Sequence, residues 1–571
     1  MIRIRIVNYI IAAMFLFLGL WLFNFNVLQG RELRAQSDKN CVRLLSQWGA
    51  RGAIYDRAGN LLAGNSLSYD VMVMPQGQGS RNQALTAVAN VLKKDQAKLN
   101  KAYRNNFIGP SLPVLIASGI TREQAIALEE LKNDIPSIIV QSRPVRSYPY
   151  GSLACHLTGY LSQIDRWRLT KLEDYGYKTK DVVGFGGIEE KYDYYLRQDE
   201  GGLSFEVDHK GRFVRVLGFK PPTNGKDVQL TLDLKVQKIV EANLADKKGA
   251  VVVMDPSTGE ILAMASFPKF EPGLFNGNAD STVAGLVNNP DALLVNRAIS
   301  FAYPPGSVFK AVVAAAALET GKIDLSTEYV CQGVVFIGKQ KFECSGVHGP
   351  QNLTQALAHS CNIFFYKSGL LLGGQNMHDW AVKFGFSRPD EIDLPYEISG
   401  FIPSPRWRKV NKFKNWFNGD TANMSIGQGD CLTTPLQVTR MMAVFANRGY
   451  LVKPYVAQAI DGGEIFAYQK KIISLGLKES TLNQVREGLR DAVSTPKGTA
   501  NSLSELPVAV AGKTGTAQAP PGRSHGWFCG FFPFDEPKYV ICVFLERGGS
   551  GAAAVAVTKQ IIAAMCAEGA A

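Results

Sequence analysis

The spacing of apolar residues divides the chain into a hydrophobic run, a long irregular stretch and a more regular C-terminal part. From Ile6 to Phe25, only Asn8, Tyr9 and Asn24 interrupt an apolar sequence. About 20 helical residues are enough to cross the ~30 Å hydrocarbon core of a bilayer. We therefore predict a membrane-spanning helix at the N-terminus.

A cleavable signal peptide is the alternative to a permanent anchor. Such peptides end at small residues of the A-x-A kind, and this run continues past Phe25 without them. We expect an uncleaved signal-anchor. Its orientation is weakly marked, because Arg3 and Arg5 precede the run while Arg31 and Arg34 follow it. The short head favours a cytoplasmic N-terminus, with the large remainder translocated.

The middle of the chain carries few regular patterns. Residues 40–220 consist of short apolar runs broken by glycine, proline and charge, with one helical stretch near Arg122–Lys132. The breaker cluster 221–225 (PPTNG) marks a domain boundary. We predict a head and anchor at 1–39, a second domain at 40–222 and a third at 223–571, because 571 residues exceed what one hydrophobic core usually holds.

Beyond this boundary the periodicity is sharper. Period-two patterns predict strands at Val228–Leu232, Ala250–Met254, Glu260–Ala265, Val508–Ala511, Gly526–Phe532 and Tyr539–Leu545. Helical spacing predicts helices at Leu234–Leu244, Phe309–Leu318, Leu353–Ala358 and Val555–Ala567. Strands at both ends with helices between them indicate an α+β domain, with helices packed around an antiparallel sheet.

Charge and cysteine content narrow the class of protein. The formal net charge is +12, and Lys and Arg are scattered rather than collected in one tract. No nucleic-acid-binding motif accompanies them, so the membrane is the better anionic partner. Nine cysteines, an odd number, cannot all pair within one chain, which excludes a disulfide scaffold.

The first candidate catalytic motif lies at the start of a predicted Ala-rich helix, in the sequence PPGSVFK (304–310). Ser307 and Lys310 are three residues apart and share a helix face. A serine hydroxyl needs a neighbouring base to become a nucleophile, and a desolvated lysine can be that base. An S-x-x-K pattern alone is common by chance, and an ordinary helix start with an incidental lysine is its more usual explanation.

Two further motifs follow in order. Ser360-Cys361-Asn362 comes after a helical pattern, and Lys513-Thr514-Gly515 ends a strand-like run, with Thr516 next. Each is weak alone. Together, S-x-x-K, S-x-N and K-T-G resemble the signature of penicillin-binding proteins and serine β-lactamases.

This resemblance implies a role for each motif residue. Ser307 would attack the penultimate D-alanine carbonyl of a stem peptide, and Lys310 would accept its proton. Ser360 would relay a proton to the leaving amine, and Asn362 would bind the substrate amide. Lys513, Thr514 and Gly515 would accommodate the substrate carboxylate. The backbone N–H groups of Ser307 and Thr516 would form the oxyanion hole.

Outside these motifs the chain is similar to class B penicillin-binding proteins. The similarity lies in the sequence RGAIYDR (51–57), in GIEE (187–190), in Glu206 to Asp208 with Gly211 and Arg212, and in GQG (427–429) with TPLQ (434–437). It implies a transpeptidase domain on a mixed, extended pedestal of the dimerisation type at 40–222.

The segments YPYG (148–151), HLTGY (156–160) and HGWF (525–528) are most similar to the elongation-type branch, penicillin-binding protein 2. That branch implies peptidoglycan D,D-transpeptidation in rod-shape maintenance, inhibition by β-lactams, and a SEDS-type polytopic glycosyltransferase (RodA-type) as partner. It also implies an inner-membrane location with the catalytic domain outside the cytoplasm. A division-type transpeptidase and a D,D-carboxypeptidase remain alternatives, as does a mainly regulatory role for residues 40–220.

One pattern points to a different enzyme. Glu479-Ser480-Thr481-Leu482-Asn483 has the E-x-x-L-N form of the deacylating glutamate in class A β-lactamases. Leu482, Val485, Leu489 and Val493 form a helical apolar stripe, with Ser480 or Thr481 as N-cap. We interpret the segment as an ordinary amphipathic helix and expect slow hydrolysis of β-lactams.

The catalytic chemistry implied here needs no cofactor, but a metal site is also suggested. Cys331, Cys344, His348 and Cys361 have the spacing C-x12-C-x3-H-x12-C. Three thiolates and an imidazole form a known structural zinc set. Some elongation-type relatives have zinc here, with ligands at the positions of Cys361 and His348 but aspartates for the other two. A Cys331–Cys344 disulfide and four unrelated packing residues are the alternatives.

Overall fold

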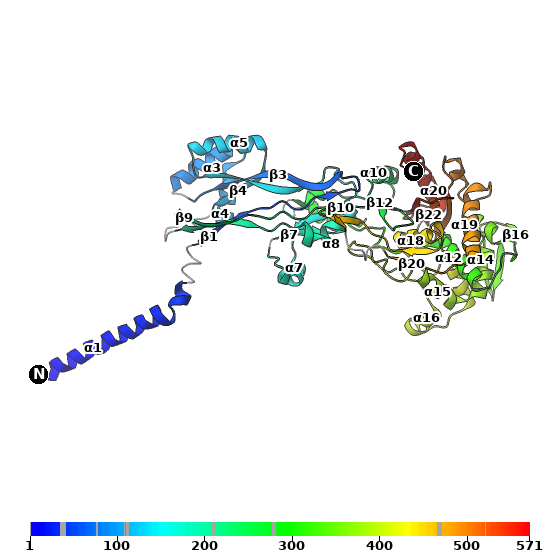
Figure 1. Ribbon diagram of the computed structural model, residues 1–571, viewed down its shortest axis with the longest axis horizontal. Helices are drawn as coiled ribbons and strands as arrows, with labels where there is room; N and C mark the ends of the chain where they lie inside the picture. Colours follow the sequence, from blue (N-terminus) through cyan, green and yellow to red (C-terminus); the bar gives the residue numbers. More distant parts are fainter. Residues whose placement is uncertain are drawn as a thin grey trace. The chain divides into compact units, whose positions relative to one another are not determined.

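The computed structural model describes residues 2–34, 42–75, 78–107, 109, 113–179, 181–207, 213–276, 281–464, 471–519 and 521–570. The chain forms two compact units, with elements labelled in Figure 1. The first contains Met1–Arg51, Asn65–Val145 and Gln198–Gly225; the second contains Gly52–Gly64, Arg146–Arg197 and Lys226–Ala571. The domain limits predicted at 39/40 and 222/223 are linear, whereas the compact units alternate along the chain.

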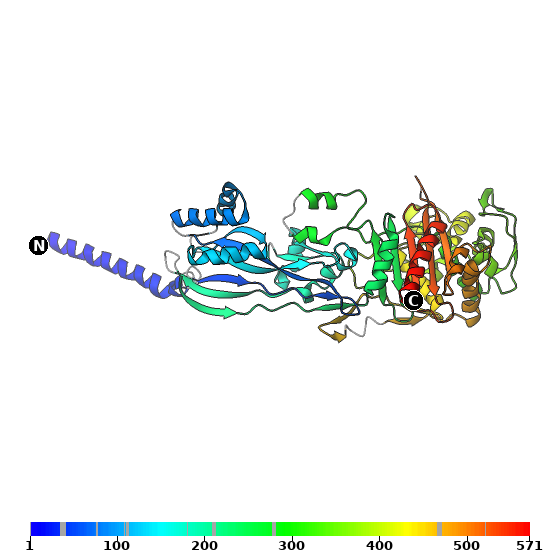
Figure 2. The same cartoon turned by 90° about the horizontal axis from the view of Figure 1, so that it is seen from above.

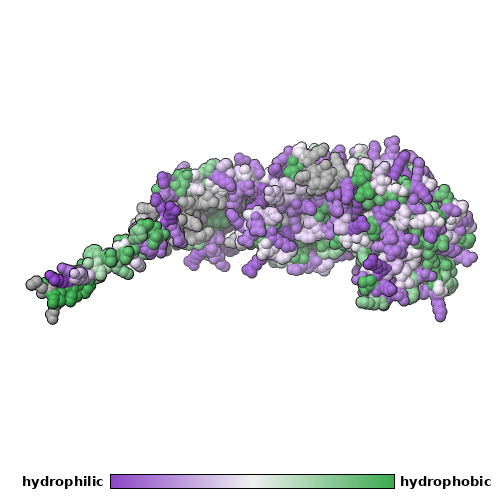
Figure 3. Space-filling view, turned by 60° about the horizontal axis from the view of Figure 1, so that its bottom comes forward, coloured by the Kyte–Doolittle hydropathy of each residue, from purple (hydrophilic) through white to green (hydrophobic). Residues whose placement is uncertain are grey.

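The first unit begins with a long apolar helix. Helix α1 (Ile2–Phe23) continues as a π-helical turn, η1 (Asn24–Leu28). Its segment Ile4–Leu28 has a mean hydropathy of 2.3, with none of it buried. Figure 3 shows this helix largely in the hydrophobic colour. The predicted helix is confirmed, and it is long and apolar enough to cross a membrane.

The strands of this unit belong to two sheets. Strands β1 (Val42–Gln47), β8 (Gly201–Val207) and β9 (Phe213–Lys220) form an antiparallel sheet in the order β1-β8-β9. Elsewhere β3 (Leu61–Val73) pairs along its second half with β4 (Val114–Ile120) and also with β5 (Ile138–Ser147). Helices α3 (Gln78–Leu92), α4 (Gln96–Asn106) and α5 (Arg122–Glu130) share a core with β3 and β4.

Periodicity within residues 40–220 therefore missed most of these elements, whereas the mixed composition of helices and strands implied by the family resemblance is confirmed. Only α5 was expected, and a capping box at Thr121 and Gln124 gives it a clear local signal. The missed strands lack simple alternation: along β3, buried residues come in runs rather than at every second position. A strand whose two faces are both partly covered loses the period-two pattern.

The second unit is built on a five-stranded antiparallel sheet. Its order is β12-β11-β23-β22-β21. The strands are β11 (Gly249–Met254), β12 (Ile261–Phe267), β21 (Ala511–Ala517), β22 (His525–Phe532) and β23 (Tyr539–Leu545). Nearly every residue of these strands is buried, because helices cover both faces of the sheet.

One face packs against α10 (Leu234–Leu244) and α20 (Gly551–Ala567), which share a core with the sheet. Figure 2 shows α20 lying across these strands. The other face packs against α18 (Pro435–Ala446), and the same core extends to α12 (Lys310–Glu319), α13 (Leu353–Ala358), α14 (Asn362–Leu372) and α19 (Glu479–Ser494). The predicted α+β layering is confirmed.

Most boundaries predicted in this unit are close to those observed. Leu234–Leu244 and Leu353–Ala358 match α10 and α13 end for end, because side chains of Asp233 and Asn352 cap them. The strand predicted at Val508–Ala511 is misplaced. Strand β21 begins at Ala511 and runs through the K-T-G motif, so the motif lies inside the strand. Its small and polar residues gave no apolar alternation.

Candidate active site

The predicted nucleophile lies in a tight turn that leads into a buried helix. Ser307 belongs to the 3-10 helix η5 (Gly306–Phe309), which runs directly into α12. Gly306 has a left-handed backbone, with φ +55°, which glycine adopts without steric cost. The indole N–H of Trp527 donates to the carbonyl of Pro304 over 3.0 Å and ties this turn to β22. Ser307 is therefore half-buried on a fixed support.

Lys310, the predicted base, is fully buried and reaches the second motif. Its Nζ donates to the carbonyl of Ser360 at 2.8 Å, to Ser360 Oγ at 3.3 Å and to Asn362 Oδ1 at 2.6 Å. Within the described residues, these are its hydrogen bonds, and Ser307 is not among the partners. Burial lowers the pKa of Lys310 to about 7, opposed by the thiols of Cys344 and Cys361. An amine with this pKa can accept a proton near neutral pH.

The S-x-N motif occupies the junction between α13 and α14. Ser360 has a left-handed backbone, with φ +56°, a conformation that is rare for residues other than glycine. Asn362 opens α14, and its amide nitrogen donates to the carbonyl of Glu343 over 3.1 Å. Strain held at a junction of this kind is typical of functional sites.

The K-T-G motif lies on β21, at one edge of the sheet. Lys513 is fully buried, and burial, followed by the charge of Lys310, lowers its pKa. Its Nζ donates to the carbonyl of Thr514 over 3.2 Å. Thr514 Oγ1 donates to Thr499 Oγ1 over 2.9 Å, and Thr516 Oγ1 accepts from the N–H of Gly551 over 3.1 Å. Two buried lysines with depressed pKa values mark a place suited to an anionic ligand.

Two glycines allow the nucleophile turn to approach β21 closely. A Cβ on Gly515 would lie 3.0 Å from the carbonyl oxygen of Pro305, and one on Gly306 would lie 2.8 Å from that of Thr516. Either side chain would push the turn and the strand apart. The three motifs, distant in sequence, thus come together in the second unit.

The GQG motif (427–429), noted in the sequence only as part of the family resemblance, lies beside these motifs. Gln428 Nε2 donates to the carbonyl of Thr516 over 3.3 Å, and the N–H of Gly306 donates to the carbonyl of Gly427 over 2.9 Å. The sequence analysis missed a further neighbour, Thr499. Thr499 follows α19 without any motif, so nothing in the sequence marked it as a partner of Thr514.

The E-x-x-L-N segment is the first turn of α19. Its apolar residues Leu482, Val485, Leu489 and Val493 are buried, whereas Glu479 is exposed. The amphipathic-helix interpretation is therefore confirmed. The predicted N-cap is wrong, because the helix begins at Glu479 and Lys478 is its N-cap, without a side-chain hydrogen bond.

The four predicted metal ligands converge beside the S-x-N motif. The donor atoms of Cys331, Cys344, His348 and Cys361 all lie within 4.8 Å of one another. His348 Nδ1 lies 3.5 Å from the sulfur of Cys331 and 3.5 Å from that of Cys344. Cys331 and Cys344 are free thiols, so the alternative disulfide is not formed.

Short strands bring these donors together. Cys331 ends β13 (Tyr329–Cys331), which pairs with β16 (Gly349–Gln351) just after His348. Cys344 follows the hairpin of β14 (Val334–Ile337) and β15 (Gln340–Glu343). Cys361 is the N-cap of α14, and the N–H of Asn362 donates to the sulfur of Cys344 over 3.2 Å.

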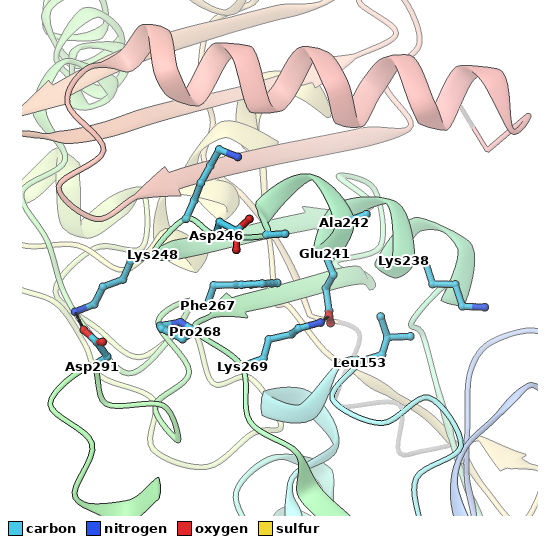
Figure 4. Close-up of a pocket in the computed structure, with 12 residues that line it drawn as sticks. Leu153, Lys238, Glu241, Ala242, Asp246, Lys248, Phe267, Pro268, Lys269 and Asp291 are labelled. Carbon is cyan, nitrogen blue, oxygen red and sulfur yellow. Dashed lines mark hydrogen bonds and ion pairs between the residues drawn. The ribbon is translucent and has the colours of Figure 1, made fainter. Parts of the chain in front are cut away.

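A cavity of about 680 Å³ lies away from the motifs, beside α10 and β12 at the other edge of the sheet (Figure 4). Its charged lining is largely paired within itself. Lys269 lies 2.8 Å from Glu241, and Lys248 lies 3.2 Å from Asp291. None of the residues of the three motifs lines this cavity.

Two of the class B motifs, RGAIYDR (51–57) and GIEE (187–190), make buried polar contacts in the second unit. Glu189 is fully buried and lies 2.6 Å from Arg146, whose guanidinium also donates to the carbonyl of Gly52 over 2.7 Å. Asp56 accepts the N–H groups of Ala58 and Asn60. Asp208, Gly211 and Arg212 lie outside the described residues.

Comparisons with known proteins agree with this geometry. Residues 249–564 match the penicillin-binding protein transpeptidase domain, and residues 46–230 match the penicillin-binding protein dimerisation domain. The peptidoglycan D,D-transpeptidase MrdA of Escherichia coli (strain K12) is 32% identical, over 95% of this chain and 90% of its own length.

Solved structures give the same result. Penicillin-binding protein 2 in a complex with MreC from Helicobacter pylori superposes with a TM-score of 0.80 at 27% identity, covering 92% of this chain and 99% of that one. A chain from a peptidoglycan synthase complex that coordinates polymerization and crosslinking gives 0.75 at 29% identity, covering 98% of both chains. The chain therefore belongs to the penicillin-binding protein transpeptidases, as a class B member of the penicillin-binding protein 2 type.

Proposed function

We propose that this protein is an elongation-type peptidoglycan D,D-transpeptidase that works through an acyl-enzyme on Ser307. The MrdA relative carries the name peptidoglycan D,D-transpeptidase. The observation that carries the residue assignment is the contact of buried Lys310 with Ser360 and Asn362, next to the turn that holds Ser307.

In the proposed first step, Ser307 Oγ attacks the carbonyl carbon of the penultimate D-alanine of a stem peptide. The neutral form of Lys310, which burial makes available near pH 7, takes the hydroxyl proton. The N–H groups of Ser307 and Thr516 stabilise the oxyanion. Ser360 passes a proton to the nitrogen of the terminal D-alanine as the C–N bond breaks, and it regains a proton from Lys310, with which it is in contact. An amine of a second stem peptide then attacks the ester carbonyl and loses a proton to Lys310. The ester C–O bond breaks, and Ser307 Oγ takes up this proton.

Lys513 and Thr514 hold the terminal carboxylate of the donor peptide in this proposal. Burial disfavours the charged form of Lys513, and a carboxylate bound beside it favours that form again. Binding of the substrate carboxylate and protonation of Lys513 therefore favour each other. A β-lactam carries a carboxylate and a reactive carbonyl in a similar arrangement, so it acylates the same serine.

Mass spectrometry after penicillin treatment tests this assignment. The full-length protein in detergent gains the mass of one penicillin on the peptide that contains Ser307, and Ser307→Ala gains none. An adduct on another residue, or cross-linking by Ser307→Ala, overturns the assignment. Rapid release of the adduct by water would favour a carboxypeptidase or β-lactamase instead.

We also propose a structural zinc ion at Cys331, Cys344, His348 and Cys361. A tetrahedral site with Zn–S bonds of about 2.3 Å separates its donor atoms by about 3.8 Å, and the present donors lie within 4.8 Å of one another. The donor set therefore fits. Zinc would cross-link β13, the end of β15 and the start of α14, and so brace the motif that positions Lys310. Metal analysis of protein purified without chelator tests this: less than stoichiometric zinc excludes the site.

The location and partners follow as further proposals. We place the protein in the inner membrane with its N-terminus in the cytoplasm, supported by the apolar helix Ile4–Leu28. The solved relative bound to MreC and the one in a synthase complex support partners in an elongation assembly. A SEDS-type glycosyltransferase is the partner we propose. Co-purification with this glycosyltransferase tests the proposed partner. We expect the protein to co-purify with it, and we expect this to be lost when α1 is exchanged for an unrelated membrane-spanning helix.

A further inference from the structure

The sequence PRWRKVNKFKNWF (405–417) forms an unusual surface on the second unit. It contains five cations and four aromatic residues and no acidic residue. Its first part is α16 (Pro405–Lys412), which Figure 1 shows at the outer edge of this unit. We refer to residues 405–417 as the basic-aromatic segment. No motif of the proposed reaction lies in it.

Two tryptophans and two ion pairs attach the segment to the unit. The ring of Trp407 packs on that of Phe401 with centroids 4.5 Å apart, and Trp416 Nε1 donates to Thr421 Oγ1 over 2.7 Å. Arg408 pairs with Asp420 at 2.7 Å. Lys412 pairs with Asp430 at 3.0 Å. The segment is therefore a fixed surface feature.

The other large apolar side chains of the basic-aromatic segment and its other cations are exposed to solvent. Phe413 is 90% exposed, Val410 60% and Phe417 63%. Arg406, Lys409 and Lys414 are also exposed. In the described part of the chain none of these three forms an ion pair, unlike Arg408 and Lys412 of the same segment. Large apolar groups interleaved with free cations favour an anionic ligand that also has apolar faces.

The backbone of Phe413 adds an independent observation. Its φ is +52°, in the left-handed region, where a bulky residue is strained. Packing does not offset this strain, because the ring is almost wholly exposed. Glycine or asparagine would satisfy the turn better. Phe413 is the C-cap of α16, and this position explains its backbone but not the choice of a large exposed ring, for which we infer a contact with a ligand.

The segment is joined to the loop that contacts the nucleophile turn. Asp430, the partner of Lys412, lies at the end of Gly427–Asp430. In that loop Gly427 accepts the N–H of Gly306, and Gln428 donates to the carbonyl of Thr516. On its other side, Gly419 lies against Gln340 and Phe342 of the β14–β15 hairpin. A polymer held at Ser307 would extend over this neighbourhood.

We propose that the basic-aromatic segment is a subsite for the peptidoglycan polymer, outside the bond that reacts. Carboxylates of neighbouring stem peptides pair with Arg406, Lys409 and Lys414. The apolar faces of sugar rings stack on Phe413 and Phe417. This inference rests on the proposed transpeptidase function and adds to it a specificity for polymeric substrate over single peptides. The link to the loop that contacts the nucleophile turn favours the polymer over a lipid surface, which also attracts basic amphipathic segments.

Co-sedimentation with purified, insoluble peptidoglycan tests the charged part of the subsite. The probe is wild-type full-length protein in detergent, compared with the triple variant R406A/K409A/K414A. The control K235A/K322A/K538A removes three exposed cations elsewhere. We expect about tenfold weaker binding for the first variant and about twofold or less for the control. Equal loss in both would show a net-charge effect and overturn the proposal.

Phe413→Gly tests the ring without straining the fold. Glycine accepts the left-handed backbone, so the melting temperature stays the same or rises, while binding to peptidoglycan falls about fivefold. Phe413→Tyr keeps a stacking ring and retains binding. Unchanged binding in Phe413→Gly contradicts the role of the ring.

Two further measurements separate this proposal from its alternatives. Labelled penicillin should acylate Ser307 in all these variants at the wild-type rate; absence of acylation in the wild type would overturn the proposed function, whatever the binding result. Vesicles containing phosphatidylglycerol should bind wild type and R406A/K409A/K414A equally. Selective loss of vesicle binding, with peptidoglycan binding intact, would show that the segment binds membrane instead.

Discussion

The ammonium nitrogen of Lys310 lies 2.6 Å from the side-chain oxygen of Asn362. The two residues belong to different helices, and their contact affects the protonation state of the lysine. Burial disfavours its charged form, while the amide oxygen accepts one of its hydrogen bonds and favours that form. The balance sets the pH at which Lys310 can act as a base.

Acylation of Ser307 should rise with pH through about 7. Burial lowers the pKa of Lys310 to about 7, and the neutral amine, which is the proposed base, gains population as pH rises through this value. At pH 6 the rate constant for acylation by a penicillin should be about a tenth of its plateau value. Stopped-flow fluorescence with a labelled penicillin measures it. A flat profile between pH 5.5 and 8.5 would contradict the role of Lys310.

Substitutions at Asn362 should move this profile in opposite directions. Asn362→Asp places a carboxylate beside the ammonium and raises the pKa of Lys310, so the midpoint should shift upward by about one unit or more. Asn362→Ala removes an acceptor and should shift the midpoint downward. The same fluorescence experiment measures both, with circular dichroism as a check on folding. Shifts in the same direction would mean that Asn362 acts through something other than Lys310.

Gly306→Ala should slow acylation far more than Gly321→Ala. Both glycines have left-handed backbones, with φ +55° and +64°, so each substitution costs about 1–2 kcal/mol of strain. Only at Gly306 would the new Cβ meet a neighbour, 2.8 Å from the Thr516 carbonyl oxygen. A displacement of about 1 Å between turn and strand can reduce the rate about a hundredfold. Equal effects on acylation would show that close approach to β21 is unimportant.

Glu189→Ala should destabilise the second unit strongly. It would leave the buried guanidinium of Arg146 without its carboxylate, which costs about 3–5 kcal/mol. Glu505→Ala breaks an exposed pair with Lys559 and should cost less than about 1 kcal/mol. Differential scanning calorimetry compares the two variants. A loss at Glu189 no larger than that at Glu505 would mean that Arg146 is satisfied by its other contacts.

Cys344→Ser should lower bound zinc, thermal stability and acylation rate together. Cys566→Ser is the matched control, because both cysteines are free and half-buried but only Cys344 lies in the cluster. Removing the proposed zinc ion from the wild-type protein with a chelator should have the same effects as Cys344→Ser. Metal content, melting temperature and penicillin acylation are the readouts. If Cys344→Ser retains full zinc, the ligand set is wrong.

Local signals explain which elements were predicted well. Helices α10 and α13 begin at side chains that cap them, and α19 carries an apolar stripe at helical spacing. Such signals depend on residues within one or two turns. The strands of the first unit and β21 depend on partners far along the chain, so their own residues carried little information about them.

Residue types and their order along the chain could be taken from the sequence alone: two serines, two lysines and an asparagine in three ordered motifs, and three cysteines and a histidine with the spacing C-x12-C-x3-H-x12-C. Which of these residues meet depends on the three-dimensional packing. Lys310 reaches Ser360 and Asn362 because α12 packs on α14, and Gly515 admits the turn of Ser307 because β21 pairs at the edge of the sheet. These contacts join residues 50 or more positions apart. Their geometry depends on the packing of a whole core, whereas composition and periodicity report only on neighbours along the chain.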